Sequence, residues 1–136
     1  MATFNRIDHV VIATADLEDA ARLWERNLGL KPVATLEQPL GAGFRVAHLP
    51  VGDAFLELIQ PLGEGGRFAE QFQERGEGLF SLSLEVDDLE GAIAHLRDKG
   101  AVVSDPEPGI WPGSRIAHLS HTSTHGVSIQ LIKRGR

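Results

Sequence analysis

The chain has 136 residues, 42% of them hydrophobic, with a formal net charge of −6 and no cysteine. This size fits one compact domain, or two small modules that share a core. The acidic balance argues against nucleic acid or an anionic membrane as a partner, and the lack of cysteine excludes disulfides and thiolate chemistry. No run approaches the about 18 apolar residues of a membrane span. We therefore expect a cytoplasmic protein that binds small molecules.

The first half of the chain predicts a strand, a helix and three more strands. Residues 7–13 are rich in β-branched side chains and predict the first strand. Asp16 is a suitable N-cap for a helix that Gly29 ends. Turn residues separate the three strands that follow, which are expected at residues 30–36, 44–51 and 54–60.

The second half predicts the same order of elements. Residues 80–86 alternate between apolar and polar side chains and predict a strand. Asp88 then begins a helix that ends at Gly100. The last three strands are expected near residues 102–103, 115–119 and 127–132.

These two halves are copies of one unit, because Asp16-Leu17-Glu18 recurs as Asp88-Leu89-Glu90 at an offset of 72 residues. We predict one α+β domain over residues 1–136. Two βαβββ modules, at residues 5–60 and 78–133, are joined by a linker with a short helix at residues 61–77. They are expected to form a curved mixed sheet with helices on one face and a central cup on the other.

The alternation of side chains along each strand predicts which residues line the cup. The first strand is expected to leave His9 on the cup face, and the fourth strand is expected to leave Glu57 there. The repeat places Ser81 and Gln130 at the equivalent positions of the second module. Glu57 is the strongest candidate, because a carboxylate flanked by apolar residues in an interior strand is costly unless it is paired.

Two arginines and two histidines also occupy equivalent positions in the copies. Arg45 and Arg115 are predicted at the cup or its rim, where they would bind a carboxylate or phosphate of the substrate. Surface ion pairs are the alternative. His48 and His118 are predicted on the helix side as buried structural residues, although a bulge would turn them towards the cup, as candidate replacements for a missing site residue.

Six segments along the chain match a known family pattern, namely residues 7–10, 28–30, 58–64, 75–78, 84–88 and 123–131. Together with the repeat, they resemble the vicinal oxygen chelate superfamily of glyoxalases, bleomycin resistance proteins and dioxygenases. Within it, the chain most resembles the methylmalonyl-CoA epimerase family. The resemblance covers essentially the whole chain.

The resemblance implies a divalent metal of the Co, Mn, Ni or Zn class in the cup. The family holds it on two histidines and two Glu or Gln residues. His9, Glu57 and Gln130 match three of these positions, with an amide where a second glutamate is usual, and Ser81 replaces the second histidine. A hydroxyl is a poor ligand beside imidazole and an amide brings no charge, so we expect the metal to be weakly bound or absent.

The implied reaction is proton abstraction next to a carbonyl or thioester, with Glu57 as the base and a small molecule such as an acyl-CoA as substrate. A glyoxalase-type isomerase or lyase, which uses the same enolate chemistry, remains an alternative. So does a metal-free protein that only binds a small molecule. Exposed edge strands favour a homodimer, whether the modules pair within one chain or swap between two.

Overall fold

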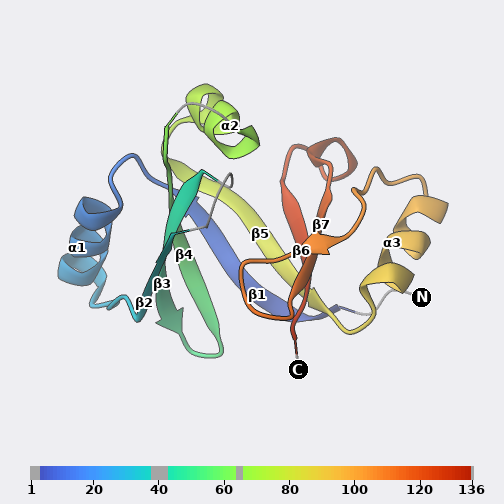
Figure 1. Cartoon of the computed structure of the whole chain (residues 1–136), viewed down its shortest axis with the longest axis horizontal. Helices are drawn as coiled ribbons and strands as arrows, with labels where there is room; N and C mark the ends of the chain where they lie inside the picture. Colours follow the sequence, from blue (N-terminus) through green and yellow to red (C-terminus); the bar gives the residue numbers. More distant parts are fainter. Residues whose placement is uncertain (1–3, 38–42, 64–65, 136) are drawn as a thin grey trace. The chain divides into compact units, whose positions relative to one another are not determined.

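The computed structural model describes residues 4–37, 43–63 and 66–135 of the chain. Its first repeat contains β1 (Phe4–Ala13), α1 (Leu17–Leu28), β2 (Ala34–Glu37), β3 (Phe44–Val51) and β4 (Ala54–Pro61). The second contains β5 (Gly78–Val86), α3 (Leu89–Asp98), β6 (Glu107–Pro108), β7 (Arg115–Leu119) and β8 (Ile129–Lys133), with the 3-10 helix η1 (His121–Ser123) before its last strand. The helix α2 (Arg67–Arg75) follows β4 and precedes β5 in the chain (Figure 1). The predicted α+β class and the two βαβββ repeats are confirmed.

Contacts divide the chain into two units, which we call the first unit (residues 10–80) and the second unit (residues 1–9 and 81–136). The division falls within β1 and within β5, so each of these strands contributes to both units. Strands within the first unit follow the order β2-β3-β4-β1, and strands within the second follow β1-β5-β8-β7-β6. These two units therefore differ from the two modules predicted from the sequence repeat. The bounds of the modules, at residues 5–60 and 78–133, stay a prediction.

Aspartates cap the first turns of α1 and α3, as their sequence positions predict. The carboxylate of Asp16 accepts a hydrogen bond from the backbone N–H of Asp19 at 3.0 Å, and Asp88 accepts one from Gly91 at 2.9 Å. Each bond satisfies an N–H group that has no partner within its helix. Gly29 ends α1 with φ of 73°, a left-handed conformation that glycine adopts without strain.

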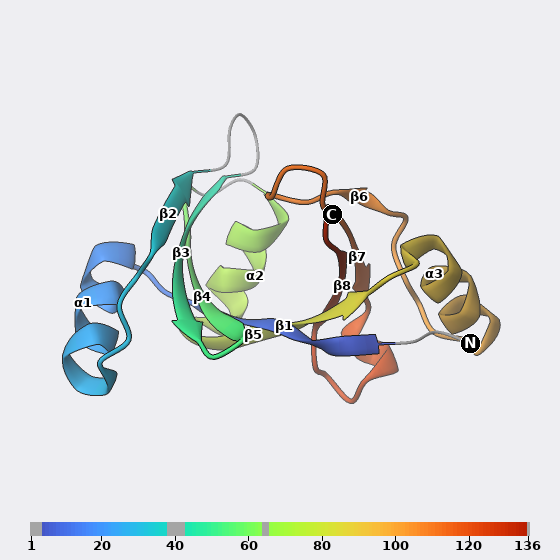
Figure 2. The ribbon, with the colours of Figure 1, turned by 90° about the horizontal axis from the view of Figure 1, so that it is seen from below.

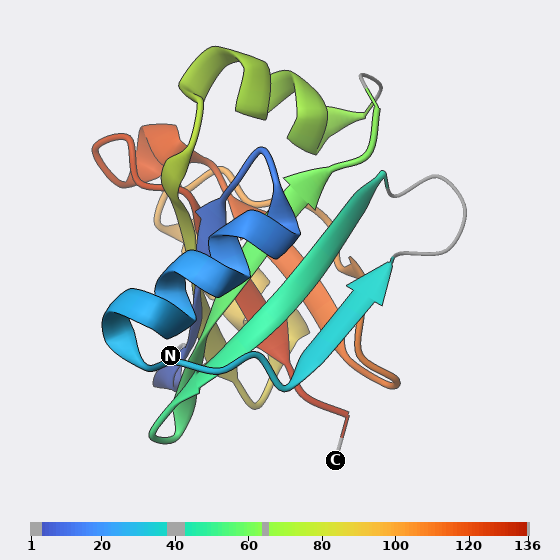
Figure 3. The same ribbon diagram turned by 90° about the vertical axis from the view of Figure 1, so that its left-hand side faces the viewer.

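The core of the first unit lies between α1 and the sheet strands β3 and β4, where Figure 3 shows α1 crossing one face of the sheet. Leu17 of α1 packs with Ala47, Leu49 and Leu58. Because Ala47 and Leu58 are direct cross-strand partners, the register places both on the helix side. The helix α2 packs in the same unit beside β4 (Figure 2).

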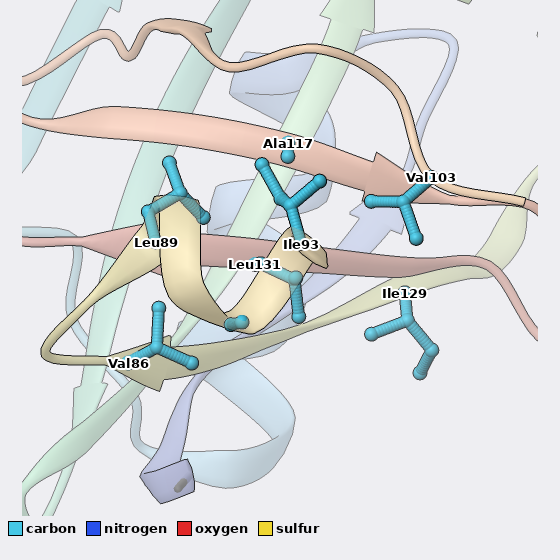
Figure 4. Close-up of a cluster of buried hydrophobic side chains, with 8 residues drawn as sticks. Val86, Leu89, Ile93, Val103, Ala117, Ile129 and Leu131 are labelled. Carbon is cyan, nitrogen blue, oxygen red and sulfur yellow. The ribbon is translucent and has the colours of Figure 1, made fainter. Parts of the chain in front are cut away.

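The core of the second unit repeats this arrangement around α3. Leu89 and Ile93 of α3 pack with side chains from β5, β7 and β8 (Figure 4). Ala117 and Leu131 are cross-strand partners in this core, as Ala47 and Leu58 are in the first. The two copies therefore keep the same alanine and leucine pair under the helix.

One predicted strand is wrong. Residues 102–103 form no strand, although Val103 makes an isolated bridge with Leu119. The outer strand β6 lies instead in the proline-rich segment that follows, at Glu107–Pro108, and is only two residues long. Proline lacks an N–H group and is confined to sheet edges, which limits this strand. In the described part of the chain, no helix has the length and apolar character to cross a membrane.

We predict that Leu58→Ala and Leu131→Ala each lower the free energy of unfolding by about 2 to 5 kcal/mol, because each leaves a cavity in a packed core. Both side chains are 0% exposed. Urea unfolding followed by circular dichroism measures the change. The control is Leu79→Ala, at a side chain that is 75% exposed. Equal losses in all three variants would contradict the assigned cores.

Candidate functional site

A histidine and a glutamate face each other on β3 and β4 of the first unit. His48 and Glu57 are direct partners in the antiparallel register, and His48 Nε2 lies 2.8 Å from Glu57 Oε1. Their exposed fractions are 4% and 7%. The ring of Phe55 contacts the imidazole edge to face, with centroids 4.5 Å apart. A buried imidazole and carboxylate at this distance can share a proton.

The predicted position of His48 on the helix side is wrong. Ala47 and Leu49 occupy that side because they pack against α1, so the residues that alternate with them point to the opposite face. Both faces of β3 carry apolar residues, and periodicity therefore could not choose between them. The cross-strand partnership with Glu57, which brings the two side chains together, is a property of the β3–β4 register.

Arg45 and Arg115 lie on the helix side rather than at the predicted cup face. Arg45 Nη2 is 2.6 Å from Glu18 Oε1 of α1, and this hydrogen bond lowers the pKa of Glu18. Arg115 makes the equivalent ion pair with Glu90 of α3. The alternative prediction of ion pairs is confirmed for both arginines. Their predicted role in substrate binding stays a prediction that these contacts do not support.

A chain of hydrogen bonds runs through the second unit from β1 to β5 and β8. Asp8 Oδ2 is 2.7 Å from His9 Nδ1, and His9 Nε2 is 2.9 Å from Ser83 Oγ. Ser83 Oγ donates to Gln130 Oε1 at 2.6 Å. The exposed fractions of Asp8, His9 and Ser83 are 0%, 3% and 0%. We call these four residues the Asp8 chain.

The Asp8 chain includes a serine that sequence reasoning missed. Ser81 is the repeat equivalent of His9 and was predicted to line the cup, but Ser83 is the serine that joins His9 to Gln130. Equivalence identifies positions related by the repeat, whereas hydrogen bonds join neighbours across strands. The parallel register of β5 and β8 pairs Ser83 directly with Gln130.

Asp8 is held by two arginines of the same unit. Arg134 donates to both carboxylate oxygens, at 2.6 and 3.0 Å, and Arg6 donates at 3.3 Å. Burial raises the pKa of Asp8. The hydrogen bonds and charges of His9 and Arg134 have a larger opposite effect, and they hold the pKa of Asp8 well below its usual range. Asp8 is therefore an acceptor at neutral pH, so His9 Nδ1 carries the hydrogen of their bond.

His118 of β7 is the direct cross-strand partner of Gln130, so the predicted helix-side position of His118 is also wrong. Its Nε2 atom lies 3.5 Å from Glu107 Oε1, and the side chain is partly exposed. The pair His118 and Gln130 thus occupies the same positions in the second copy that His48 and Glu57 occupy in the first.

The predicted ligand set of His9, Glu57 and Gln130 does not fit a divalent metal. Over residues 4–37, 43–63 and 66–135, no group of three or more His, Cys, Asp or Glu side chains could hold a metal ion. His9 contacts Ser83 and Gln130 supplies an amide, which makes one imidazole beside neutral oxygens. Glu57 is paired with His48. Divalent transition metals favour several imidazole, thiolate or carboxylate ligands, so we derive no step through a metal.

Two hollows in the second unit lie around Arg134. The larger, of about 360 Å³, is lined by Arg6, Trp111, Pro112, Arg134 and Gly135. The smaller, of about 140 Å³, is lined by residues 85–87 and by Lys133 and Arg134. Both hollows are therefore lined by Arg134, which forms the ion pair with Asp8.

We predict that Arg134→Ala lowers the free energy of unfolding at pH 7 by about 3 kcal/mol, because it removes a partner from a buried carboxylate. The lowered pKa of Asp8 contributes stability above its usual value of about 4, and this is lost as the pH falls through the lowered pKa. The difference between variant and wild type should shrink below about pH 4 in urea unfolding.

The control for this measurement is Arg22→Ala, at a side chain that is 72% exposed and 3.7 Å from Asp19. A pH-independent difference for Arg134→Ala would show that lost packing, rather than the charge on Asp8, causes the destabilisation.

Residues 8–118 match the model of the glyoxalase, bleomycin resistance protein and dioxygenase superfamily. The ethylmalonyl-CoA/methylmalonyl-CoA epimerase of Cereibacter sphaeroides is 31% identical over 129 residues, which cover 93% of this chain and 96% of that protein. The human mitochondrial methylmalonyl-CoA epimerase is 32% identical over 128 residues, covering 93% and 72%.

Solved structures agree along the whole chain. The methylmalonyl-CoA epimerase of Mycobacterium tuberculosis superposes with a TM-score of 0.89 at 29% identity, over 100% of this chain and 92% of that one. A variant of the Streptomyces coelicolor epimerase, solved with 2-nitronate-propionyl-CoA, gives 0.86 at 29% identity over 96% and 95%. The chain belongs to the glyoxalase, bleomycin resistance protein and dioxygenase superfamily, and methylmalonyl-CoA epimerases are among its most similar members.

Proposed function

We propose that this chain is an epimerase-like isomerase that moves a proton at the carbon next to the carbonyl of an acyl-CoA thioester. The buried pair of His48 and Glu57, with Nε2 and Oε1 2.8 Å apart, carries the proposal. Similarity to methylmalonyl-CoA epimerases supports the substrate class, since such enzymes have been solved with 2-nitronate-propionyl-CoA and with methylmalonyl-CoA.

Glu57 is the proposed base. Its carboxylate takes the α-hydrogen as a proton, the electron pair of the C–H bond moves into the enolate, and the negative charge goes to the thioester oxygen. The imidazole of His48 shares the proton with Glu57 through their hydrogen bond, so the carboxylate is available again for the reverse step. Water returns a proton to the opposite face of the planar enolate, which inverts the configuration, and the proton held by the His48 and Glu57 pair passes to the hydroxide that remains.

The divalent metal that the resemblance implies is left out of this mechanism. The predicted ligand set of His9, Glu57 and Gln130 contains one imidazole and one carboxylate, and each of these two groups has a hydrogen-bond partner on the protein. The donor set therefore favours proton transfer by side chains alone.

A metal-free binding protein is the second candidate function. The residues that favour it are Ser81 and Gln130, whose neutral groups stand where the family pattern has a histidine and a glutamate. A glyoxalase-type isomerisation would use the same base and the same enolate. The expected homodimer and cytoplasmic location stay predictions.

We predict that the protein exchanges the α-hydrogen of methylmalonyl-CoA with solvent deuterium, as measured by mass spectrometry. Glu57→Gln should slow the exchange by about 100- to 10,000-fold, the usual contribution of a general base. Glu74→Gln, at an exposed position on α2, is the control. If the wild-type protein does not raise the exchange rate above that of methylmalonyl-CoA alone, a binding protein would be the better interpretation.

We also predict that the protein contains no stoichiometric divalent metal by elemental analysis, and that chelation by EDTA leaves its deuterium exchange rate unchanged. The double variant Ser81→His and Gln130→Glu supplies the two residues that the family pattern has at these positions. It should gain visible absorption on titration with Co²⁺, which wild type should lack. A wild-type protein that binds Co²⁺ at one equivalent and needs it for exchange would refute the metal-free mechanism.

A further inference from the structure

We propose that Ser83 is a nucleophile and that the chain hydrolyses activated acyl compounds, with acyl thioesters as the natural class. The geometry points to an Asp8, His9 and Ser83 triad within the second unit. The choice of thioester rests on the proposed function, whereas the reactivity of Ser83 does not. Such a site is recognised by the roles and distances of its members, in whatever order they occur in the chain.

Each member of the triad lies within hydrogen-bond reach of the partner that its role requires. Ser83 Oγ is 2.9 Å from His9 Nε2, which is within reach for the base to take its proton. His9 Nδ1 is 2.7 Å from Asp8 Oδ2, so the carboxylate orients the ring and balances the charge that forms on it. The three side chains are buried, which favours fixed geometry over exchange with water.

The orienting carboxylate is itself fixed. Arg134 holds Asp8 with two hydrogen bonds, at 2.6 and 3.0 Å, from the residue after the end of β8. A bidentate pair of this kind restricts the carboxylate to one plane. His9 and Ser83 lie on the strands β1 and β5, and catalytic groups on strands are held more closely than groups on loops.

Gln130 controls access to the nucleophile. Ser83 is 0% exposed, and its proton is held by Gln130 Oε1 at 2.6 Å. Gln130 is partly exposed, so a substrate carbonyl reaches Ser83 by displacing this amide. Once the amide has moved, the hydroxyl hydrogen turns to His9 Nε2, and the amide N–H group of Gln130 becomes a donor for the carbonyl oxygen.

The reaction then balances without a cofactor. Ser83 Oγ forms a bond to the thioester carbonyl carbon as its proton passes to His9. The C–S bond breaks, and the thiol leaves with that proton. Water next attacks the Ser83 ester, gives a proton to His9 and releases the carboxylic acid, while the returning proton restores the serine hydroxyl.

Because the chain contains no cysteine, the single variant Ser83→Cys carries a unique thiol. Its alkylation by iodoacetamide at pH 7 measures access and activation together. The matched control is Ser114→Cys, at a serine that is 3% exposed and whose Oγ donates to the backbone oxygen of Trp111 at 2.7 Å. We expect Ser83→Cys to react at least about 100-fold faster, and the addition of His9→Gln to remove that advantage.

The wild-type serine is tested with a fluorophosphonate probe and intact-protein mass spectrometry. One adduct is expected, on the peptide that contains Ser83, with faster labelling in Gln130→Ala and none in Ser83→Ala. Ser114→Ala should retain the adduct, and circular dichroism confirms that each variant is folded. An unlabelled wild type and Gln130→Ala, or an adduct that persists in Ser83→Ala, would overturn the proposal.

Two assays separate this inference from the proposed function. Release of free CoA from propionyl-CoA reports on Ser83, and α-deuterium exchange in methylmalonyl-CoA reports on Glu57. Ser83→Ala should abolish the release of CoA, and Glu57→Gln should slow the exchange. Adduct formation without any exchange would overturn the proposed isomerase alone, and exchange without adduct formation or CoA release would overturn the nucleophile alone.

Discussion

The buried carboxylate of Asp8 is the group on which the polar interior of the second unit depends. It is 0% exposed, and it receives hydrogen bonds from Arg6, His9 and Arg134. A charge in this position is tolerated only while its partners are in place, since a buried carboxylate without them would be strongly destabilising. Arg134 follows β8 and Asp8 lies in β1, so one ion pair joins two strands that are far apart in sequence. The orientation of His9, and through it of Ser83 and Gln130, follows from that pair.

The two copies of the repeat keep their cores and differ in their polar faces. Ala47 and Leu58 pack under α1 as Ala117 and Leu131 pack under α3, because each helix has to bury its apolar face against the sheet. The opposite faces of the same strands carry His48 with Glu57 in one copy and His118 with Gln130 in the other. A single exchange of carboxylate for amide removes the charge from the second pair. Packing thus constrains one face of each sheet strand and leaves the other open to different chemistry.

Similarity to methylmalonyl-CoA epimerases along the whole chain supports a shared fold and a related substrate class more strongly than it supports a shared mechanism. Among the predicted ligand residues, His9 contacts Asp8 and Ser83, Gln130 accepts from Ser83, and Glu57 is paired with His48. Both sets of contacts suit proton transfer between side chains.

Much of the architecture followed from local rules in the amino-acid sequence: the repeat, the aspartate caps at Asp16 and Asp88, and the α+β order of elements. These features depend on neighbours within a few residues or on the similarity of two segments. The sequence did not predict which face of the sheet each side chain of β3 occupies, because β3 carries apolar residues on both faces. Only the packing of β3 against α1 decides that His48 lies on the face where it meets Glu57. Ser83 also emerged only from the tertiary structure, since the pairing of β5 with β8, rather than the repeat, brings it to Gln130. Arg134 reaches Asp8 across 126 residues of sequence, a distance over which no local pattern carries information.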